Sequence, residues 1–314
     1  MDAGAIRLGG RLGERALEIL AGRQQPAVPR DAATVMLLRS TAAPGAITPG
    51  AAAPGASASE TAAPGTEAPG TEPTEADGGI EVYMLRRQSS MAFAPGAFVF
   101  PGGSVDARDA DEQVAWAGPE PAEWGRVFDA PPELACALVC AAVRETFEES
   151  GVLLAGPSAD AVVADTTGAD WEADRHALLD RSLSLAEMLG RRGLVLRSDL
   201  LRPWSRWITP VVEERRFDAR FFAAALPHGQ RTRDVGGEAS EVAWVRPGDA
   251  IAAGRRKEIV LYPPTAVTLG ELAACPDVAA ALRPRQVRPL LPEASVADGA
   301  AWLTLPADLE YPLS

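Results

Sequence analysis

A predicted helix over residues 133–150 constrains the fold more than any other feature of this sequence. Pro131 and Pro132 precede it and Gly151 follows it, and proline at the start with glycine just past the end is the usual punctuation of a helix. Apolar residues recur in it at helical spacing: Leu134, Leu138, Val139, Ala142, Val143 and Phe147. The sequence therefore predicts a helix that is buried along one seam against a sheet.

Three carboxylates crowd one arc of this helix, because Glu145, Glu148 and Glu149 lie within about one turn at roughly 100° per residue. Like charges so close repel one another unless a cation lies between them. Clustered hard oxygen ligands suit Mg²⁺ or Mn²⁺. The alternative is a solvated acidic face. A Phe-Pro pair followed by Gly102 and Gly103 lies upstream and favours the metal site, since glycines allow the backbone to approach a metal or phosphate closely.

A tract over residues 40–79 interrupts the first half of the chain with repeats of Ala-Pro-Gly. It contains no aromatic residue and too few large apolar ones to offset the entropy of ordering, which predicts a disordered insertion. The flanking segments 33–39 and 79–87 are expected to be strands that belong together. Other predicted strands cover residues 207–212, 217–225 and 242–245, and other predicted helices cover residues 5–22, 171–192 and 265–274.

This pattern predicts one α/β domain over residues 33–285, in which 40–79 and 107–132 are insertions. Residues 1–32 are expected to be a helical extension. Residues 286–314 are rich in proline and are expected to be a C-terminal tail that wraps the surface.

Charge and cysteine content exclude several classes of protein. The chain has a formal net charge of −13, which disfavours nucleic-acid binding because that depends on neutralising phosphates with Lys and Arg. Its three cysteines form no CxxC pair, which argues against a disulfide framework or a structural zinc site. No apolar stretch is long enough for a signal peptide or a membrane span. We expect a cytoplasmic protein without a nucleic-acid or membrane partner; the oligomeric state is open.

The acidic helix resembles the second half of the Nudix box, G-x5-E-x7-R-E-U-x-E-E-x-G-U, where U is apolar. Gly103 matches the first glycine of that motif. The matching residues of the second half are Arg144, Glu145, Phe147, Glu148, Glu149, Gly151 and Val152. Gly103 and Arg144 are 41 positions apart where the plain motif has 14, so 27 residues interrupt the box.

An interrupted box is similar to that of a Nudix hydrolase subgroup that includes the peroxisomal coenzyme A diphosphatase. Four stretches support the similarity: FAPGAFVFPGG, CAAVRETFEESGVLL, RWITPVVEERRFDARFFAAAL and EIVLYPPTAVTLGEL. The resemblance implies a Nudix-type α/β/α sandwich with a mixed β-sheet, and a hydrolase that uses Mg²⁺ or Mn²⁺ to cleave the diphosphate of a nucleoside diphosphate derivative. Coenzyme A or acyl-CoA, split into 3′,5′-ADP and (acyl-)phosphopantetheine, is the implied substrate. The alternatives are an ADP-ribose or NADH pyrophosphatase and a non-catalytic nucleotide-binding sensor.

The resemblance also implies roles for the motif residues. Glu145, Glu148 and Glu149 are the implied metal ligands, and Arg144 is expected to orient a glutamate. The first glutamate of the motif falls on Cys136, and Glu133, one turn earlier, is a possible substitute.

Four further residues are candidates. Many family members use another glutamate from the second half of the domain as a ligand or base, and Glu238 and Glu241 lie in the corresponding region. Arg216 and Arg220 are candidates to bind the substrate's phosphates, and an ion-paired surface strand is the alternative.

Two interpretations of the box insertion stay open. It is either a lid that shapes the pocket for a long substrate through Trp116, Trp124 or Phe128, or a spacer that bulges away from the site.

Overall fold

The structure is a computed structural model that describes residues 5–41, 79–88, 94–110, 113–233 and 239–313. The tract predicted to be disordered lies outside the described residues except at its two ends. Those ends adjoin one another, because the Thr41 amide donates a hydrogen bond to the Gly79 carbonyl at 2.8 Å. The tract therefore leaves and rejoins the domain at one point.

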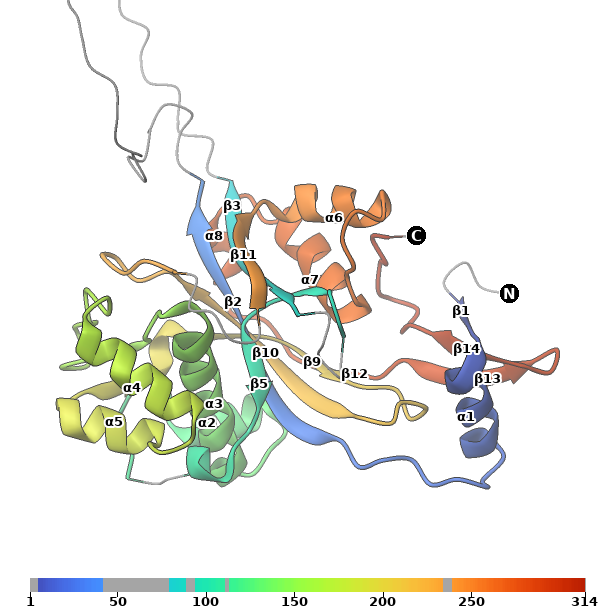
Figure 1. Cartoon of the computed structure of the whole chain (residues 1–314), viewed down its shortest axis with the longest axis horizontal. Helices are drawn as coiled ribbons and strands as arrows, with labels where there is room; N and C mark the ends of the chain where they lie inside the picture. Colours follow the sequence, from blue (N-terminus) through green and yellow to red (C-terminus); the bar gives the residue numbers. More distant parts are fainter. Residues whose placement is uncertain (1–4, 42–78, 89–93, 111–112, 234–238, 314) are drawn as a thin grey trace, which may run out of the picture.

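A mixed sheet forms the centre of the molecule (Figure 1). Its strands run in the order β11 (Ala239–Val245), β3 (Ile80–Arg87), β2 (Arg30–Ser40), β10 (Phe217–Ala225), β9 (Arg202–Ile208) and β12 (Pro289–Leu290). β2 is antiparallel to β3 and parallel to β10. Two short strands join this sheet, β4 (Phe98–Val99) beside β3 and β5 (Gly102–Ser104) beside β2. As predicted, the strands on either side of the tract pair directly.

Alternate residues of the central strands pack into two separate cores. On β2, Val35 and Leu37 face one core while Met36 and Leu38 face the other, as expected of side chains that alternate along a strand. The first core is covered by α2 (Pro121–Phe128), α3 (Pro132–Ser150), α4 (Ala169–Leu179) and α5 (Leu185–Arg192). The second is covered by α6 (Pro247–Arg255), α7 (Pro263–Ala273) and α8 (Val278–Ala281). The predicted α/β/α sandwich with a mixed sheet is confirmed.

The predicted helix 133–150 is α3, and it ends where the sequence indicates. Pro132 occupies its first turn, and Gly151 caps its end with a φ of 73°, a conformation that a side chain disfavours. α3 packs against β2 and is buried on most of its surface. The acidic half of α3 is therefore held at a fixed place beside the sheet.

The predicted N-terminal helix and C-terminal tail differ from the structure. They combine into a terminal module of β1 (Ala5–Leu8), α1 (Gly10–Leu20), β13 (Glu293–Ala297) and β14 (Ala300–Thr304). β1 pairs with β14 antiparallel, with Ile6 opposite Leu303. The local sequence does not reveal a strand whose partner lies at the other end of the chain.

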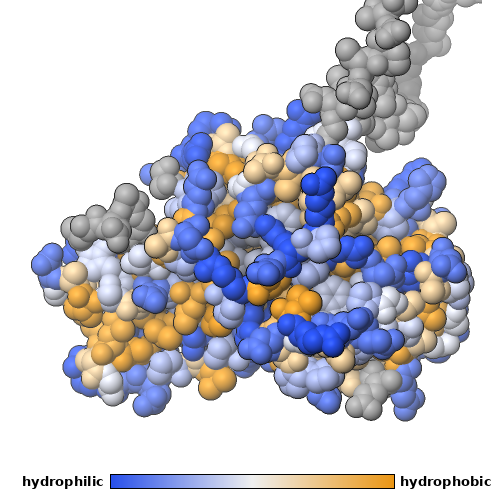
Figure 2. Space-filling view, turned by 180° about the vertical axis from the view of Figure 1, so that it is seen from behind, coloured by the Kyte–Doolittle hydropathy of each residue, from blue (hydrophilic) through white to orange (hydrophobic). Residues whose placement is uncertain are grey.

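The terminal module is small and only partly buried. Its core consists of Ala16, Val212 and Ala301 with a few half-buried neighbours. Several exposed apolar side chains lie in the module or its connections: Ile6, Leu20, Val28, Leu291 and Val296. Figure 2 shows an apolar area on that side of the molecule. The module thus buries far less apolar surface than the sandwich does.

The remaining differences concern the segments around α3. The predicted helix 171–192 is two helices, α4 and α5, with Ser184 capping the second. The box insertion contains a short 3₁₀ helix, η1 (Ala107–Ala110), and then β6 (Trp116–Ala117) and α2. β6 joins β7 (Ala155–Gly156) and β8 (Val195–Arg197) in a small sheet, and η2 (Ser198–Leu200) leads into β9. In the described part of the chain, every helix is too short or too polar to cross a bilayer.

Candidate active site

The glycine strand β5 touches the acidic half of α3. The Gly102 amide donates a hydrogen bond of 2.9 Å to Oε2 of Glu149. A Cβ atom on Gly103 would overlap the carboxylate of Glu145, with its Cδ only 2.7 Å away. Both glycines let the backbone approach closely, as predicted, and what the backbone approaches here is the pair of box glutamates.

Arg144 lies between two of the glutamates. Its Nη1 donates to Oε1 of Glu145 at 2.8 Å and to Oε2 of Glu148 at 3.1 Å. Its Nε and Nη2 donate to the two carboxylate oxygens of Asp109, each at 2.9 Å. Such a paired hydrogen bond fixes the guanidinium of Arg144 and the carboxylate of Asp109 in one plane. The guanidinium therefore lies between carboxylates of α3 and of the insertion and is hydrogen-bonded to both.

Asp109 is a residue that the sequence analysis missed. It comes from η1 in the box insertion, and only 2% of its surface is exposed. Cys136, at the position of the first motif glutamate, lies in the apolar core instead. Asp109 thus supplies Arg144 with a carboxylate from outside the helix. A single aspartate in an insertion carries no periodicity or spacing signal that would have found it.

Glu133 does not act as the suggested substitute. It lies exposed in the first turn of α3, eleven residues before Arg144. At 1.5 Å per residue this is about 16 Å along the helix axis, beyond the reach of a glutamate side chain. Besides Glu145 and Glu148 of its own helix, Arg144 therefore pairs with Asp109 of the insertion and not with Glu133.

The environment of Glu148 disfavours a negative charge. Burial and then the neighbouring Glu145 carboxylate raise the pKa of Glu148 to about 7, although Arg144 opposes the shift. Only 6% of the residue is exposed. A buried carboxylate beside other carboxylates is stabilised in its ionised form when a further cation binds nearby.

The donor set fits a hard divalent cation in its chemistry. Glu145, Glu148 and Glu149 contribute only carboxylate oxygens, all within about one helical turn beside β5. Within the described part of the chain, no three His, Cys, Asp or Glu side chains converge closely enough to hold a metal ion. Arg144 accounts for this, because it holds Glu145 and Glu148 in ion pairs while Glu149 binds Gly102. The three glutamates therefore suit a divalent cation by residue type and by location. Their side chains would have to rotate for the carboxylates to contact one ion.

Of the two further glutamate candidates, the structure describes only Glu241. Glu241 is on β11 at the edge of the sheet, with 53% of its side chain exposed, and it pairs with Arg86 of β3 at 3.6 Å. Glu238 lies outside the described residues. Among the described residues, no contact of Glu241 reaches the acidic half of α3.

The two arginine candidates are engaged inside the protein. Arg216 donates to the backbone carbonyls of Thr209 and Ala27, at 2.9 and 2.7 Å. Arg220 is almost fully buried and forms ion pairs with Asp31 and Asp218. These contacts fix strand β10 beside β2 and leave the guanidinium groups turned toward the protein, so we do not include them in the substrate site.

The aromatic residues of the box insertion belong to the core. Trp124 and Phe128 of α2 are 3% and 1% exposed and pack on Phe222 of the sheet, with ring centroids 5.6 and 5.1 Å away. Trp116 is half-buried and donates to the Pro119 carbonyl. Trp124 and Phe128 are therefore core residues and leave no exposed aromatic face for a lid, while the role of the insertion toward substrate stays a prediction. The insertion is an integral part of one helical layer.

Comparison with known proteins agrees with this architecture. Residues 122–272 match the family model described as the NUDT19 Nudix domain. The acyl-coenzyme A diphosphatase NUDT19 of Xenopus laevis is 27% identical over 229 residues, which cover 61% of this chain and 59% of the relative. The protein of the same name from Gallus gallus is 29% identical over 237 residues, which cover 59% and 58%. The chain thus spans less than two thirds of the length of these relatives.

A solved structure matches over most of the chain. The crystal structure of a Nudix hydrolase from Alicyclobacillus acidocaldarius has a TM-score of 0.63 and 26% sequence identity. The match covers 84% of this chain and 99% of that one. The α/β/α sandwich described above is therefore the Nudix fold.

Proposed function

Because this chain has the Nudix fold and resembles the coenzyme A diphosphatase subgroup of that superfamily, we propose that it hydrolyses a diphosphate linkage. The preferred substrate is coenzyme A or an acyl-CoA. Water adds to one phosphorus and the bridging oxygen leaves with the other phosphate, which yields 3′,5′-ADP and (acyl-)phosphopantetheine. The named activity of the relatives supports this substrate.

One observation carries the proposal: three glutamates, an arginine and a glycine strand meet at the end of α3. A diphosphate is densely anionic, and bare carboxylates would repel it. The cluster suits this substrate only with divalent cations between the two sets of oxygens.

Glu145, Glu148 and Glu149 are the proposed ligands of Mg²⁺ or Mn²⁺. Such an ion neutralises phosphate charge and lowers the pKa of a water molecule, so that hydroxide is available near neutral pH. Arg144 keeps the carboxylates aligned and is itself held by Asp109. Gly102 and Gly103 let β5 lie directly against β2 and the Glu145 carboxylate, and they are the proposed backbone neighbours of the substrate's phosphates.

A substrate panel tests the proposal. The purified chain is incubated with Mg²⁺ or Mn²⁺ and with coenzyme A, acetyl-CoA, ADP-ribose or NADH, and the products are separated by chromatography. We expect turnover of the coenzyme A compounds to exceed that of the other two. Faster hydrolysis of ADP-ribose or NADH would show that the substrate is not a coenzyme A compound. Nucleotide binding without turnover would favour a non-catalytic sensor.

The variant Glu148→Gln is the matched test of the site. Glutamine has nearly the same shape but lacks the charge needed to bind a cation, so activity should fall by a factor of at least about 100. Glu258→Gln removes an exposed carboxylate that pairs with Arg256 and should leave the activity unchanged. EDTA should abolish turnover in the parent protein, and added Mg²⁺ should restore it. Undiminished activity in EDTA or in Glu148→Gln contradicts the proposed metal site.

A further inference from the structure

The last turn of α3 is anchored by groups from outside the helix. Helix ends leave carbonyls without intrahelical partners. Here the Glu148 carbonyl accepts a hydrogen bond of 3.0 Å from Nη1 of Arg175. The Ser150 carbonyl accepts one of 3.1 Å from the amide of Arg233. The Gly151 carbonyl accepts one of 2.6 Å from Oγ1 of Thr166.

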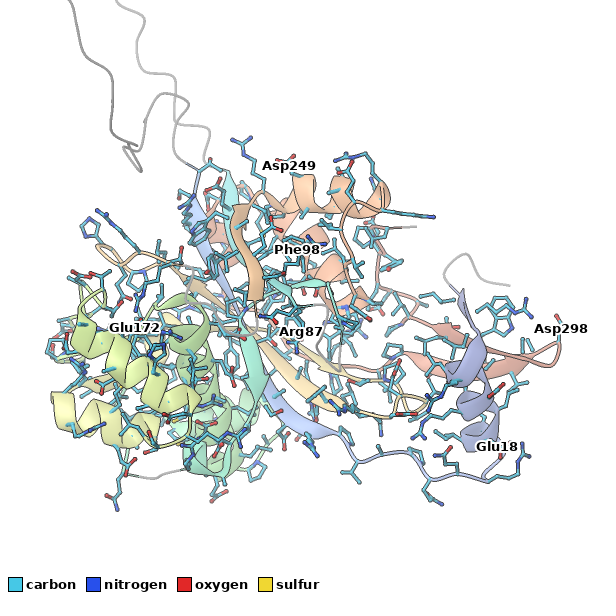
Figure 3. The ribbon with its side chains drawn as sticks, viewed as in Figure 1. Glu18, Arg87, Phe98, Glu172, Asp249 and Asp298 are labelled. Atoms are coloured by element: carbon cyan, nitrogen blue, oxygen red, sulfur yellow. The ribbon has the colours of Figure 1, made fainter. Side chains whose placement is uncertain are left out.

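Arg175 of α4 is the charged side chain among these donors that is almost fully buried, with 1% of its surface exposed. A buried guanidinium requires a counter-charge, and Glu172 supplies it. Nε of Arg175 donates to Oε1 of Glu172 at 2.9 Å, and Nη2 of Arg175 donates to the same oxygen. Hydrogen bonding to Arg175, followed by its charge, lowers the pKa of Glu172 to about 2, against the opposing effect of burial. Glu172 therefore stays ionised and holds Arg175 against the end of α3. Figure 3 labels Glu172 on α4.

Arg233 completes the arrangement and connects it to the sheet. Its Nη2 donates to the second oxygen of Glu172 at 3.2 Å, and its carbonyl accepts from the Tyr83 hydroxyl of β3 at 3.1 Å. A Cβ atom on Gly151 would overlap the Arg233 guanidinium, so glycine lets Arg233 lie directly against the helix end. We call Arg175, Glu172 and Arg233 the C-terminal clamp of α3.

We propose that Arg175 is a positioning residue for Glu148, and that the C-terminal clamp fixes the last turn of α3 so that the carboxylates of Glu148 and Glu149 can bind a divalent cation. The inference rests on the proposed function. It adds a group that no box motif contains, supplied by a helix that follows the box.

Two physical arguments support this role. Arg175 bonds to the backbone of Glu148 itself, so its loss frees the residue that carries the buried carboxylate. A cation at a helix C-terminus also stabilises the helix dipole, which keeps the turn wound. Outer groups that orient metal ligands typically change metal affinity or activity by about 10–100-fold when they are removed.

The test compares Arg175→Gln with Arg192→Gln. Arg192 of α5 pairs with Asp174 of α4 and stacks 3.5 Å above the ring of Trp171, so its loss weakens the same helix pair. Within the described structure, Arg192 makes no hydrogen bond to the α3 backbone and reaches α3 only through Trp171, whose ring meets that of Phe147 edge-on with centroids 6.1 Å apart. Mn²⁺ affinity is measured on the substrate-free protein, together with kcat and KM. Hydrogen exchange is measured over residues 147–152, where the Gly151 amide bonds to the Phe147 carbonyl at 2.9 Å.

We expect Arg175→Gln to weaken Mn²⁺ binding and lower kcat by about 10–100-fold, with a smaller change in KM, and to speed exchange at Gly151. Arg192→Gln should leave all three unchanged. Arg175→Lys keeps one donor and the charge and should recover part of the affinity. Glu172→Gln keeps Arg175 but removes the charge of its partner, so it should cause a loss of Mn²⁺ affinity smaller than that of Arg175→Gln. If Arg175→Gln does not fold, Glu172→Gln is the variant that tests the inference.

Two outcomes overturn the inference: equal losses of Mn²⁺ affinity in the Arg175 and Arg192 variants, or unchanged exchange over residues 147–152 in both Arg175→Gln and Glu172→Gln. A parent protein that neither binds Mn²⁺ nor cleaves any substrate would refute the proposed function instead. The exchange measurement would then still decide whether the clamp holds the helix end.

Discussion

A single guanidinium balances three carboxylates where the acidic half of α3 begins. Arg144 contacts Glu145 and Glu148 on its own helix and Asp109 from the insertion. Because Asp109 takes up two of the donors, the attraction of Arg144 for the box glutamates is divided. For the proposed metal site, we therefore expect Asp109 to help keep those glutamates available to a cation.

The variant Asp109→Asn tests this balance. The amide keeps the shape of the side chain but loses its charge, so Arg144 should hold Glu145 and Glu148 more firmly. We expect Mn²⁺ affinity and kcat to fall by about 10–100-fold. Titration calorimetry and steady-state kinetics measure the two effects. Asp199→Asn, which removes an ion pair with Arg197 at 2.7 Å, is the control and should change neither. Equal effects of both variants would show that Asp109 has no special connection to the site.

The sequence was informative about residues whose neighbours are close in the chain. Glu145, Glu148 and Glu149 share a face through helical spacing alone, and Arg144 adjoins them. Asp109 and Arg175 escaped the analysis because their contacts span 35 and 27 residues. A loop aspartate or a helical arginine resembles any surface charge until the fold brings its partner to it.

At the scale of elements, the box insertion is a structural layer, and its aromatic residues connect α2 to the sheet. Phe128 stacks at 6.0 Å from Trp124 and meets Phe222 edge-on. The helix was not foreseen because aromatic residues between prolines suit a lid as well as a core. The contact of Phe128 with Phe222 shows that the helix belongs to the core, and Phe222 lies nearly a hundred residues further along the chain.

Phe128→Ala should therefore destabilise the protein by about 3–5 kcal/mol, the usual cost of emptying a buried aromatic site. Urea unfolding followed by circular dichroism measures this free energy. Val127→Ala, on the half-exposed side of the same helix, should cost far less. A lid would behave in the opposite way, with an unchanged free energy of unfolding and a raised KM for coenzyme A.

The Ala-Pro-Gly tract is joined to the domain at adjacent strand ends. Deletion of residues 42–77 would leave Thr41, Gly78 and Gly79 as a short turn between β2 and β3, whose ends already pair at Ser40 and Ile80. Loop-closure entropy depends only weakly on length, so we expect the melting temperature to change by less than about 4 °C and the activity to persist. Differential scanning calorimetry checks this. A large loss of stability would mean that the tract packs on the domain.

At the scale of the whole molecule, the terminal module and the sandwich differ in how much they bury. The module joins both ends of the chain, a pairing that no local pattern in residues 5–8 or 300–304 predicts. Its small core combines Ala16 and Ala301 of the module with Val212 from the connection between β9 and β10, whereas the sandwich buries two extended apolar cores. Local stability follows buried apolar contact, so the two parts should open independently.

Hydrogen exchange followed by mass spectrometry measures this difference. Amides of β1, α1, β13 and β14 should exchange at least about tenfold faster than those of β2 and β10, because opening the module exposes little apolar surface. Equal protection in the two parts would show that the module unfolds only together with the sandwich.

The most direct test of the central claim, that the acidic end of α3 hydrolyses the diphosphate of an acyl-CoA, is to identify the products formed in ¹⁸O-labelled water. Acetyl-CoA is incubated with the protein and Mg²⁺, and the masses of the products are measured by mass spectrometry. We predict 3′,5′-ADP and acetyl-phosphopantetheine, with one ¹⁸O atom in the phosphate of one of them. An intact diphosphate, or release of free coenzyme A and acetate by cleavage of the thioester, would contradict it.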